Sequence, residues 1–223
     1  MHNSVSYNWA GTDAGTTHSY TEVTSDVVVP HTVLTCSNST VSLWTGLGNA
    51  KLLQNGVADY GSTANQWHWW FEAVWGSSDT GEVNVGGSVS PGQSMYLDTY
   101  YDTSTLQVQF FWYNNTTGQS NSYTSGYING HPAGYYYDSQ YSEAIVERQT
   151  RSGAYTSLRK WDSGDVPFTN AYVYWASGSN AIRYVTHYDV DMWDSSGLNR
   201  QLASWVSKPS LDDFSVHHET ACS

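Results

Sequence analysis

The sequence predicts an all-β protein built as a sandwich or a barrel, and three observations support this prediction. Short runs of β-branched and aromatic residues are separated by turn residues at roughly ten-residue spacing. Ser, Thr, Gly, Asn and Tyr are spread along the whole chain, and no segment keeps an apolar period of about 3.6 residues for more than two or three turns. No stretch has the composition of a linker, so we expect a single domain over residues 1–223.

The turn residues divide the chain into candidate strands. We expect strands at 22–29, 40–47, 51–57, 67–75, 94–101, 107–113, 142–148, 171–175 and 182–192. Residues 90–93 (SPGQ) and 114–118 (NNTTG) have turn chemistry, and we expect each to connect the two strands of a hairpin. Only residues 198–206 could form a short helix.

Two of these strands carry acid on one face. In WHWWFEAVW (67–75) every odd position is apolar and belongs to a core, while His68, Trp70, Glu72 and Val74 share the opposite face. In SEAIVE (142–147) the pleat places both glutamates and the isoleucine on one face, and Ala and Val on the other. A face that mixes aromatic and acidic side chains suggests a concave sheet that holds an extended polymer.

The composition excludes several partners. Eight Lys and Arg against 20 Asp and Glu give a formal charge of −12, which argues against nucleic acid and anionic membranes. No apolar run approaches a membrane span, and no charged and then apolar leader follows Met1, so either a leader has been removed or none exists here. The scarcity of bases limits the positive charge in acid, so the composition tolerates low pH.

The chain shows no signature of a metal or a cofactor. Cys36 and Cys222 permit one disulfide without demonstrating it, and a zinc site is not expected. Asp189, Asp191 and Asp194 lack the loop glycine and terminal glutamate of a calcium loop. We therefore expect a monomer without metal or cofactor.

Two functional hypotheses remain from these residues. Aromatic clefts with two carboxyl groups about 5 to 10 Å apart hydrolyse glycans. Glu143 and Glu147 are four residues apart in a strand, about 13 Å, which is too far, but a pair that includes Glu72 across strands is possible. A carbohydrate-binding module without catalysis belongs to the same hypothesis. The second hypothesis is peptide hydrolysis.

The second hypothesis comes from a family resemblance carried by a series of short blocks in a fixed order. The blocks are NWAG (8–11), VVP (28–30), LWTGLG (43–48), LLQNG (52–56), WWFE (69–72), VSPGQ (89–93), NTTGQ (115–119), SEAIVE (142–147) and FTNA (168–171). Each block is short, but their order and spacing over about four-fifths of the chain resemble the glutamic peptidases, or eqolisins, whose members include the scytalidoglutamic and aspergilloglutamic peptidases and bacterial relatives.

The resemblance implies a fold, a reaction and a set of site residues. The family's fold is a lectin-like sandwich of two long, curved antiparallel sheets, comparable to a concanavalin jelly roll, with a concave groove for the substrate. By position, Gln54 and Glu147 become the catalytic pair of a secreted, acid-acting endopeptidase, and polypeptides become its substrates. Trp9, Trp44 and Glu72 are implicated in lining the cleft. Arg148 is expected to be a structural or surface residue, since it lies on the opposite pleat face.

The chain departs from the family pattern after its W-x-G-x block, and its segment from Trp44 to Gln54 is shorter than in the fungal enzymes. Family members commonly carry an Asp after the W-x-G-x pattern, where this chain has Gly48 followed by Asn49. His68 stands where fungal relatives have an acid, so it is one candidate to replace the missing group. This departure affects the expected pH profile more than the expected reaction.

Overall fold

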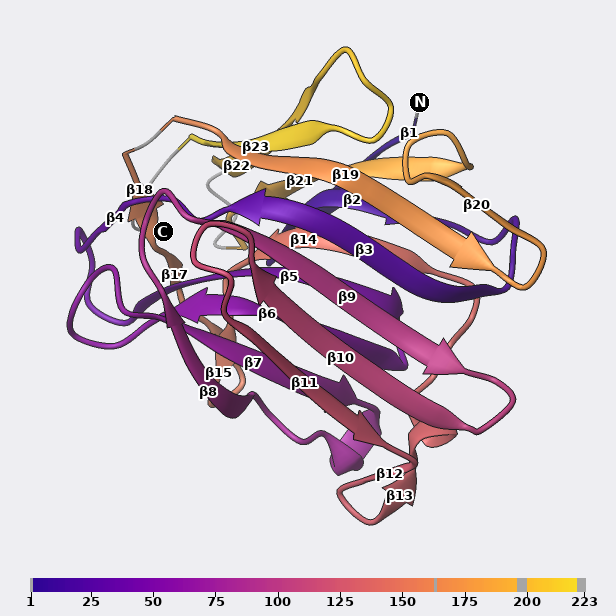
Figure 1. Cartoon of the computed structure of the whole chain (residues 1–223). Coiled ribbons are helices and arrows are strands. Elements are labelled where there is room, and N and C mark those ends of the chain that lie inside the picture. Colours follow the sequence, from indigo (N-terminus) through magenta and orange to yellow (C-terminus); the bar gives the residue numbers. More distant parts are fainter. Residues whose placement is uncertain (1, 163, 196–199, 220–223) are drawn as a thin grey trace.

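The protein is a sandwich of two β-layers, shown in Figure 1 by a computed structural model that describes residues 2–162, 164–195 and 200–219. The longer strands are β1 (His2–Ser6), β2 (Trp9–Ala14), β3 (Tyr20–Val28), β5 (Ser39–Gly48), β6 (Leu52–Asp59), β7 (Trp67–Val74), β8 (Val83–Val89), β9 (Ser94–Asp102), β10 (Gln107–Asn114), β11 (Ser120–Ser125), β14 (Ser142–Glu147), β19 (Val166–Trp175), β20 (Gly178–Ala181), β21 (His187–Trp193), β22 (Gln201–Ser207) and β23 (Phe214–His218). The two-residue strands are β4 (Thr32–Val33), β12 (Tyr127–Ile128), β13 (His131–Pro132), β15 (Thr150–Arg151), β16 (Ala154–Tyr155), β17 (Ser157–Leu158) and β18 (Lys160–Trp161). Two short 3₁₀ turns, η1 (Gly76–Ser78) and η2 (Ala133–Tyr135), complete the described elements.

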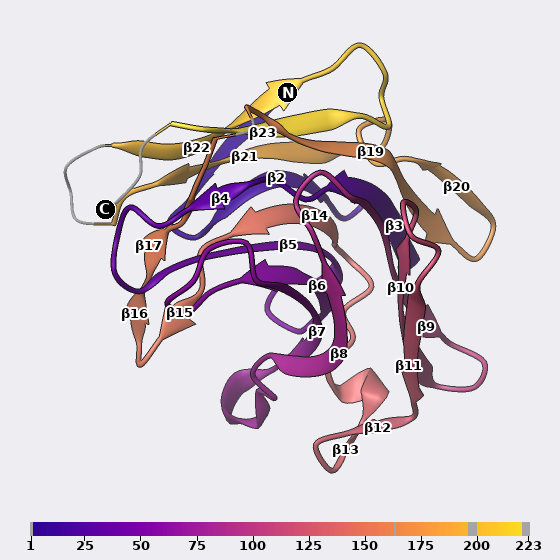
Figure 2. The same cartoon turned by 60° about the vertical axis from the view of Figure 1, so that its left-hand side comes forward.

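The first layer has the strand order β8-β7-β6-β5-β14-β2-β21, with every neighbour antiparallel. Strand β1 adds to β21 in parallel. The second layer runs β11-β10-β9-β3-β19-β23-β22 and is also antiparallel. Because β22 also pairs with β21, the two layers are joined along one edge. Figure 2 shows both layers curving in the same direction from this edge.

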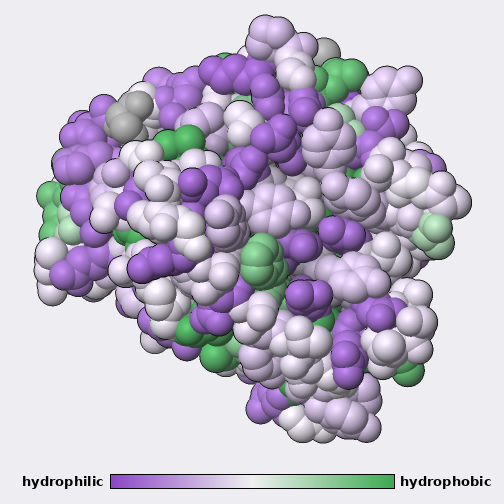
Figure 3. Space-filling model, in the orientation of Figure 1, coloured by the Kyte–Doolittle hydropathy of each residue, from purple (hydrophilic) through white to green (hydrophobic). Residues whose placement is uncertain are grey.

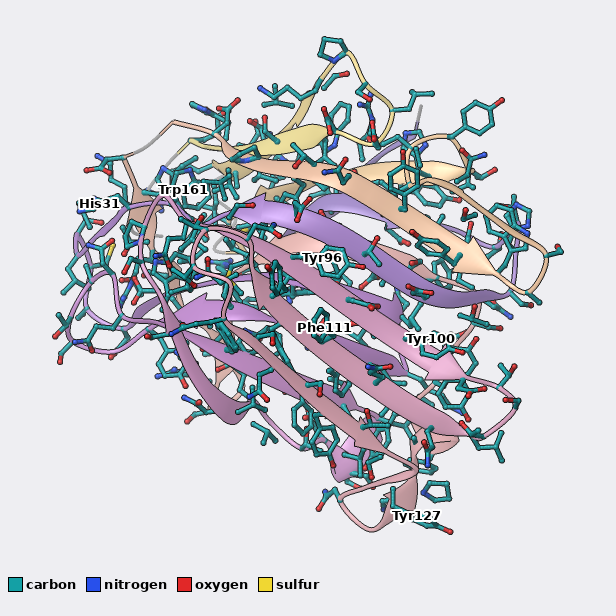
Figure 4. The ribbon with its side chains drawn as sticks, viewed as in Figure 1. His31, Tyr96, Tyr100, Phe111, Tyr127 and Trp161 are labelled. Carbon is teal, nitrogen blue, oxygen red and sulfur yellow. The ribbon has the colours of Figure 1, made fainter. Side chains whose placement is uncertain are left out.

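The main core lies between the layers and follows from the two-residue period of the strands. In β9, Met95 and Leu97 are buried, whereas Tyr96 and Tyr100 point outward beside Phe111 of β10 (Figure 4). The outer face of the second layer, seen in Figure 3, is largely hydrophilic, with scattered hydrophobic residues.

Most of the predicted strands are confirmed, with ends that differ by a few residues. In the segment 182–192 only the later part is extended, as β21. Residues 114–118 connect the hairpin of β10 and β11, as expected. Residues 90–93 form a turn, but the expected hairpin is wrong: β8 pairs with β7 and β9 pairs with β3 and β10, so this turn carries the chain from one layer to the other.

The predicted helix over 198–206 is wrong where the structure describes it. Residues 198 and 199 lie outside the described residues, Arg200 is in neither helix nor strand, and residues 201–206 belong to strand β22. Its backbone pairs with β23 on one side and β21 on the other, and these ladders outweigh a weak local helical pattern.

Two further observations concern the chain as a whole. Cys36 is disulfide-bonded, and Cys222, the other cysteine of the sequence, lies outside the described residues. Among the described helices, none has the length and apolar character needed to cross a membrane.

Candidate active site

A second, smaller apolar cluster lies on the outer face of the first layer. It contains Trp44, Leu52, Ala58, Trp70 and Ile145, with Trp9, Tyr60 and Val74 packed against it. The odd positions of β7 and the Ala and Val of β14 belong to the main core instead. The two faces predicted from the sequence for these strands are therefore confirmed.

This outer face forms the floor of a cavity of about 520 Å³. Its lining comes from β2, β6, β7, β14 and the loops beside them, and comprises Asn8, Trp9, Asn49, Leu52, Gln54, Tyr60, Trp70, Glu72, Val74, Asp79, Gly81, Glu82, Glu147, Gln149, Thr150 and Arg151. Four of the five residues singled out from the sequence are in this lining. Trp44 is not, because it is fully buried beneath it.

Glu147 ends β14 and is held by two N–H donors. The side-chain amide of Asn8 donates to Oε1 at 3.0 Å, and the indole of Trp44 donates to Oε2 at 2.8 Å. Burial raises the pKa of Glu147 to about 7, while Trp9, Asn8 and Trp44 oppose the rise because they favour the ionised form. A carboxyl group with this pKa can both accept and return a proton near neutrality.

Trp9 and Trp44 fix the position of this carboxyl group. Their rings meet edge to face, with centroids 5.4 Å apart and planes at 81°. Trp9 lies in the cavity lining. Trp44, which was also expected to line the cleft, lies beneath the lining and reaches the site through its indole N–H.

Gln54 is held by a second carboxyl group. Its amide nitrogen donates to Oε2 of Glu72 at 2.7 Å, and its Oε1 is buried without a hydrogen-bond partner among the described residues. Burial, together with the neighbouring charges of Asp79 and Glu147, raises the pKa of Glu72 well above its usual value. The charge of Glu147 therefore contributes to the raised pKa of Glu72.

Glu143 faces the same side as Glu147 but does not reach the cavity. It is fully buried, and neither of its carboxyl oxygens has a hydrogen-bond partner among the described residues. Its neighbour across the ladder is Asp13, and burial raises the pKa of both groups. Arg148 faces away, as predicted: it is buried, and its Nε donates to the Tyr7 carbonyl at 2.7 Å.

The departure from the family pattern has a local cause. Gly48 has a φ of +111°, and a Cβ there would lie 1.8 Å from the carbonyl oxygen of Lys51, so an Asp does not fit this tight connection. His68 does not replace the acid beside Gln54: its ring packs against Tyr60, and its Nε2 lies 4.0 Å from Glu82. Asp79 is the acid that lies beside Glu72.

Several lining residues were not predicted as site residues. Asn8 lies within the NWAG block, so its place in the motif was an available signal. Asp79, Glu82, Gln149 and Arg151 lie in loops or short strands whose approach to the groove depends on tertiary contacts, and no periodic pattern marks them.

The fold and the site together define a class: a two-layer β-sandwich hydrolase with carboxyl and amide side chains along a groove on one outer face. A model of the Peptidase A4 family matches residues 7–212, and the chain belongs to this family. It is therefore a peptide-bond hydrolase of the glutamic peptidase group. No curated protein matches the sequence.

Solved structures support the fold. A scytalido-glutamic peptidase with a peptide-based transition-state analogue superposes with a TM-score of 0.74 at 19% identity, covering 96% of this chain and 98% of that chain. SCP-B, a member of the eqolisin family in complex with the tripeptide Ala-Ile-His, superposes with a TM-score of 0.72 at 19% identity and the same coverage. The lectin-like sandwich expected from the resemblance is thus confirmed.

Proposed function

We propose that this peptidase is an endopeptidase of polypeptides, active at acidic to neutral pH, in which Glu147 and Gln54 activate one water molecule. The observation that carries the proposal is that a carboxyl group held by two N–H donors and an amide held by a carboxyl group line the same cavity. Because Glu147 acts as a base only when it is ionised, its pKa of about 7 favours activity on the neutral side of this range. Activity in strong acid is a prediction that rests on the family resemblance.

Glu147 is the proposed acid and base. Ionised Glu147 takes a proton from water as the water oxygen attacks the scissile carbonyl carbon. When the C–N bond breaks, Glu147 returns this proton to the departing amine, so that a carboxyl group and an amine leave and the enzyme is restored. The hydrogen bonds from Asn8 and Trp44 favour the ionised form that the first step requires.

In the proposed mechanism, Gln54 forms hydrogen bonds to the attacking water and to the oxyanion of the tetrahedral intermediate. An amide NH2 has two hydrogens, and one of those on Gln54 is donated to Glu72. The second is left for the oxygen that becomes negative in the tetrahedral intermediate, while Oε1 accepts from the attacking water. Glu72 thus positions the amide, and its raised pKa keeps it protonated and uncharged below neutral pH.

The test is the digestion of a denatured protein by wild type and three variants. We expect Glu147→Gln to lose about 10²- to 10⁴-fold in kcat/KM and Gln54→Ala about 10²- to 10³-fold. Glu143→Gln is the matched control, because Glu143 is also a glutamate on the same face of β14 but lies outside the cavity lining. We expect this variant to keep its activity. Full activity in Glu147→Gln or Gln54→Ala, or loss confined to Glu143→Gln, rejects the assignment. Release of reducing sugar from a glycan panel would support the carbohydrate hypothesis instead.

We also propose that the protein acts outside the cell and as a monomer. The disulfide-bonded Cys36 supports an oxidising compartment. Fractionation of the source culture, with size-exclusion chromatography of the active fraction, tests both statements.

A further inference from the structure

Arg151 is the only basic side chain among the described residues that line the active-site cavity. It follows Glu147 by four residues, which is at most about 13 Å along an extended chain. It also lines a second cavity, bounded by residues 34–40 together with Gly61 and Ser62. Arg151 therefore lines both the active-site cavity and this neighbouring cavity.

Two contacts hold the guanidinium in place. Its central carbon lies 4.6 Å from the centre of the Tyr60 ring, and one terminal nitrogen donates to Oε1 of Gln149 at 3.1 Å. The amide nitrogen of Gln149 in turn donates to Glu82. Gln149 thus lies between Arg151 and Glu82, and no ion pair joins these two among the described residues.

The remaining guanidinium donors are available to a ligand. A guanidinium has five N–H donors in a planar fork, a geometry that matches both oxygens of a carboxylate. Arg151 is exposed, and the described residues offer it a single hydrogen-bond acceptor. A side chain that is oriented by stacking and by one hydrogen bond loses less conformational freedom when it binds a ligand.

The lining of the groove carries an acidic side chain, Asp79, in one part and a basic side chain, Arg151, in another. Burial raises the pKa of Glu82 to about 7, so this carboxyl group is mostly uncharged in acid. Asp79 lies exposed in the lining beside Glu72, on the side of the cavity formed by β7 and the loop after it. A substrate carboxylate is repelled near Asp79 and attracted near Arg151.

We propose that Arg151, stacked on Tyr60, forms a subsite that binds a carboxylate of the peptide substrate within about four residues of the scissile bond. This inference rests on the proposed function of the groove. The carboxylate belongs either to an acidic side chain or to the C-terminus of a short peptide.

The test compares three enzymes on one set of internally quenched peptides at about pH 6, where a peptide Glu is ionised. Each peptide carries Glu, Gln or Lys at one position, which is varied over about four residues on either side of the scissile bond, and has a free or an amidated C-terminus. The enzymes are wild type, Arg151→Gln and Lys51→Gln. Lys51 is a matched control because it is also stacked on an aromatic ring, 5.0 Å from the Trp75 centroid, but does not line the cavity.

For wild type and Lys51→Gln we expect a preference for Glu over Lys of about three- to tenfold in kcat/KM at one position, mainly through KM and weaker at high salt. In Arg151→Gln the ratio should fall to about one, because the neutral amide no longer attracts the carboxylate of Glu or repels the ammonium of Lys. If amidation alone removes the preference, the terminal carboxylate is the ligand. An equal preference in Arg151→Gln and wild type, or no preference in wild type, overturns the inference but leaves the peptidase assignment intact; a wild type that cleaves no peptide overturns the proposed function instead.

Discussion

Replacing Trp44 by Phe should move the pH dependence of catalysis without removing the catalytic groups. The substitution deletes the indole N–H that donates to Oε2 of Glu147 at 2.8 Å and keeps an aromatic ring in the floor of the groove. Because the lost hydrogen bond favours the ionised carboxylate, its removal raises the pKa of Glu147.

The size of the shift follows from the energy of such a bond. A hydrogen bond to a charged group contributes about 1.5 to 3 kcal/mol, and one pKa unit corresponds to about 1.4 kcal/mol. Glu147 keeps partial access to the groove and a second donor in Asn8, so we expect the lower end, about one unit. The pKa of Glu147 would then move from about 7 to roughly one unit higher.

The assay is kcat/KM for one fluorogenic peptide at a series of pH values spanning about three units on either side of neutrality. The acid limb should shift upward by about one unit, with a loss of about tenfold below the midpoint and convergence above it. Trp112→Phe is the control, since Trp112 is equally buried and donates its N–H to the Gly56 carbonyl at 3.1 Å, in the core between the layers. A folded Trp44→Phe enzyme with an unmoved acid limb would refute the role given to Glu147.

Two further predictions concern stability. Burial raises the pKa of Glu143 and of Asp13, the latter to about 7, above the values of 4.5 and 3.8 for unperturbed groups, so the folded state retains protons that the unfolded chain releases. This stabilisation is complete below about pH 4 and declines as the pH rises, by at most about 1.4 kcal/mol per pH unit for each group, through about pH 7 for Asp13. The free energy of unfolding, measured in urea, should therefore decline less steeply with pH for Glu143→Gln than for wild type, and parallel declines would contradict the buried-acid account. Arg159 forms a fully buried ion pair with Asp59 at 2.8 Å, so Arg159→Met should reduce the free energy of unfolding by about 3 to 5 kcal/mol. A double variant that also carries Asp59→Asn should recover part of this loss, because it removes the unpaired buried charge. An unchanged urea midpoint in the single variant would show that the pair is not needed for stability.

The pleated faces of the site strands could be predicted from the sequence because a strand has a fixed two-residue period. The alternation in β7 and β14 separated the core side from the groove side before any tertiary contact was considered. Periodicity alone, however, gave Glu143 and Glu147 the same face and could not choose between them. The resemblance chose Glu147, and the cavity lining agrees with that choice.

Other features depended on contacts between distant segments. The turn at 90–93 has hairpin chemistry, yet it crosses between layers because β9 pairs with β3 rather than with β8. Likewise, residues 201–207 pair on both sides and become a strand in spite of a weak helical pattern. In both cases the strand pairing, and not the local residue pattern, decided the outcome.

By itself, the sequence determined the all-β class, the two faces of the strands at 67–75 and 142–147, and the family, because these depend on local spacing and on the order of short blocks. Only the tertiary structure decided that Asn8 and Trp44 hold Glu147, that Glu72 holds Gln54, and that Arg151 stands at the rim of the same groove. The physical reason is that a hydrogen bond acts over about 3 Å, and folding alone brings side chains that lie as far apart in the chain as Asn8 and Glu147 to that distance.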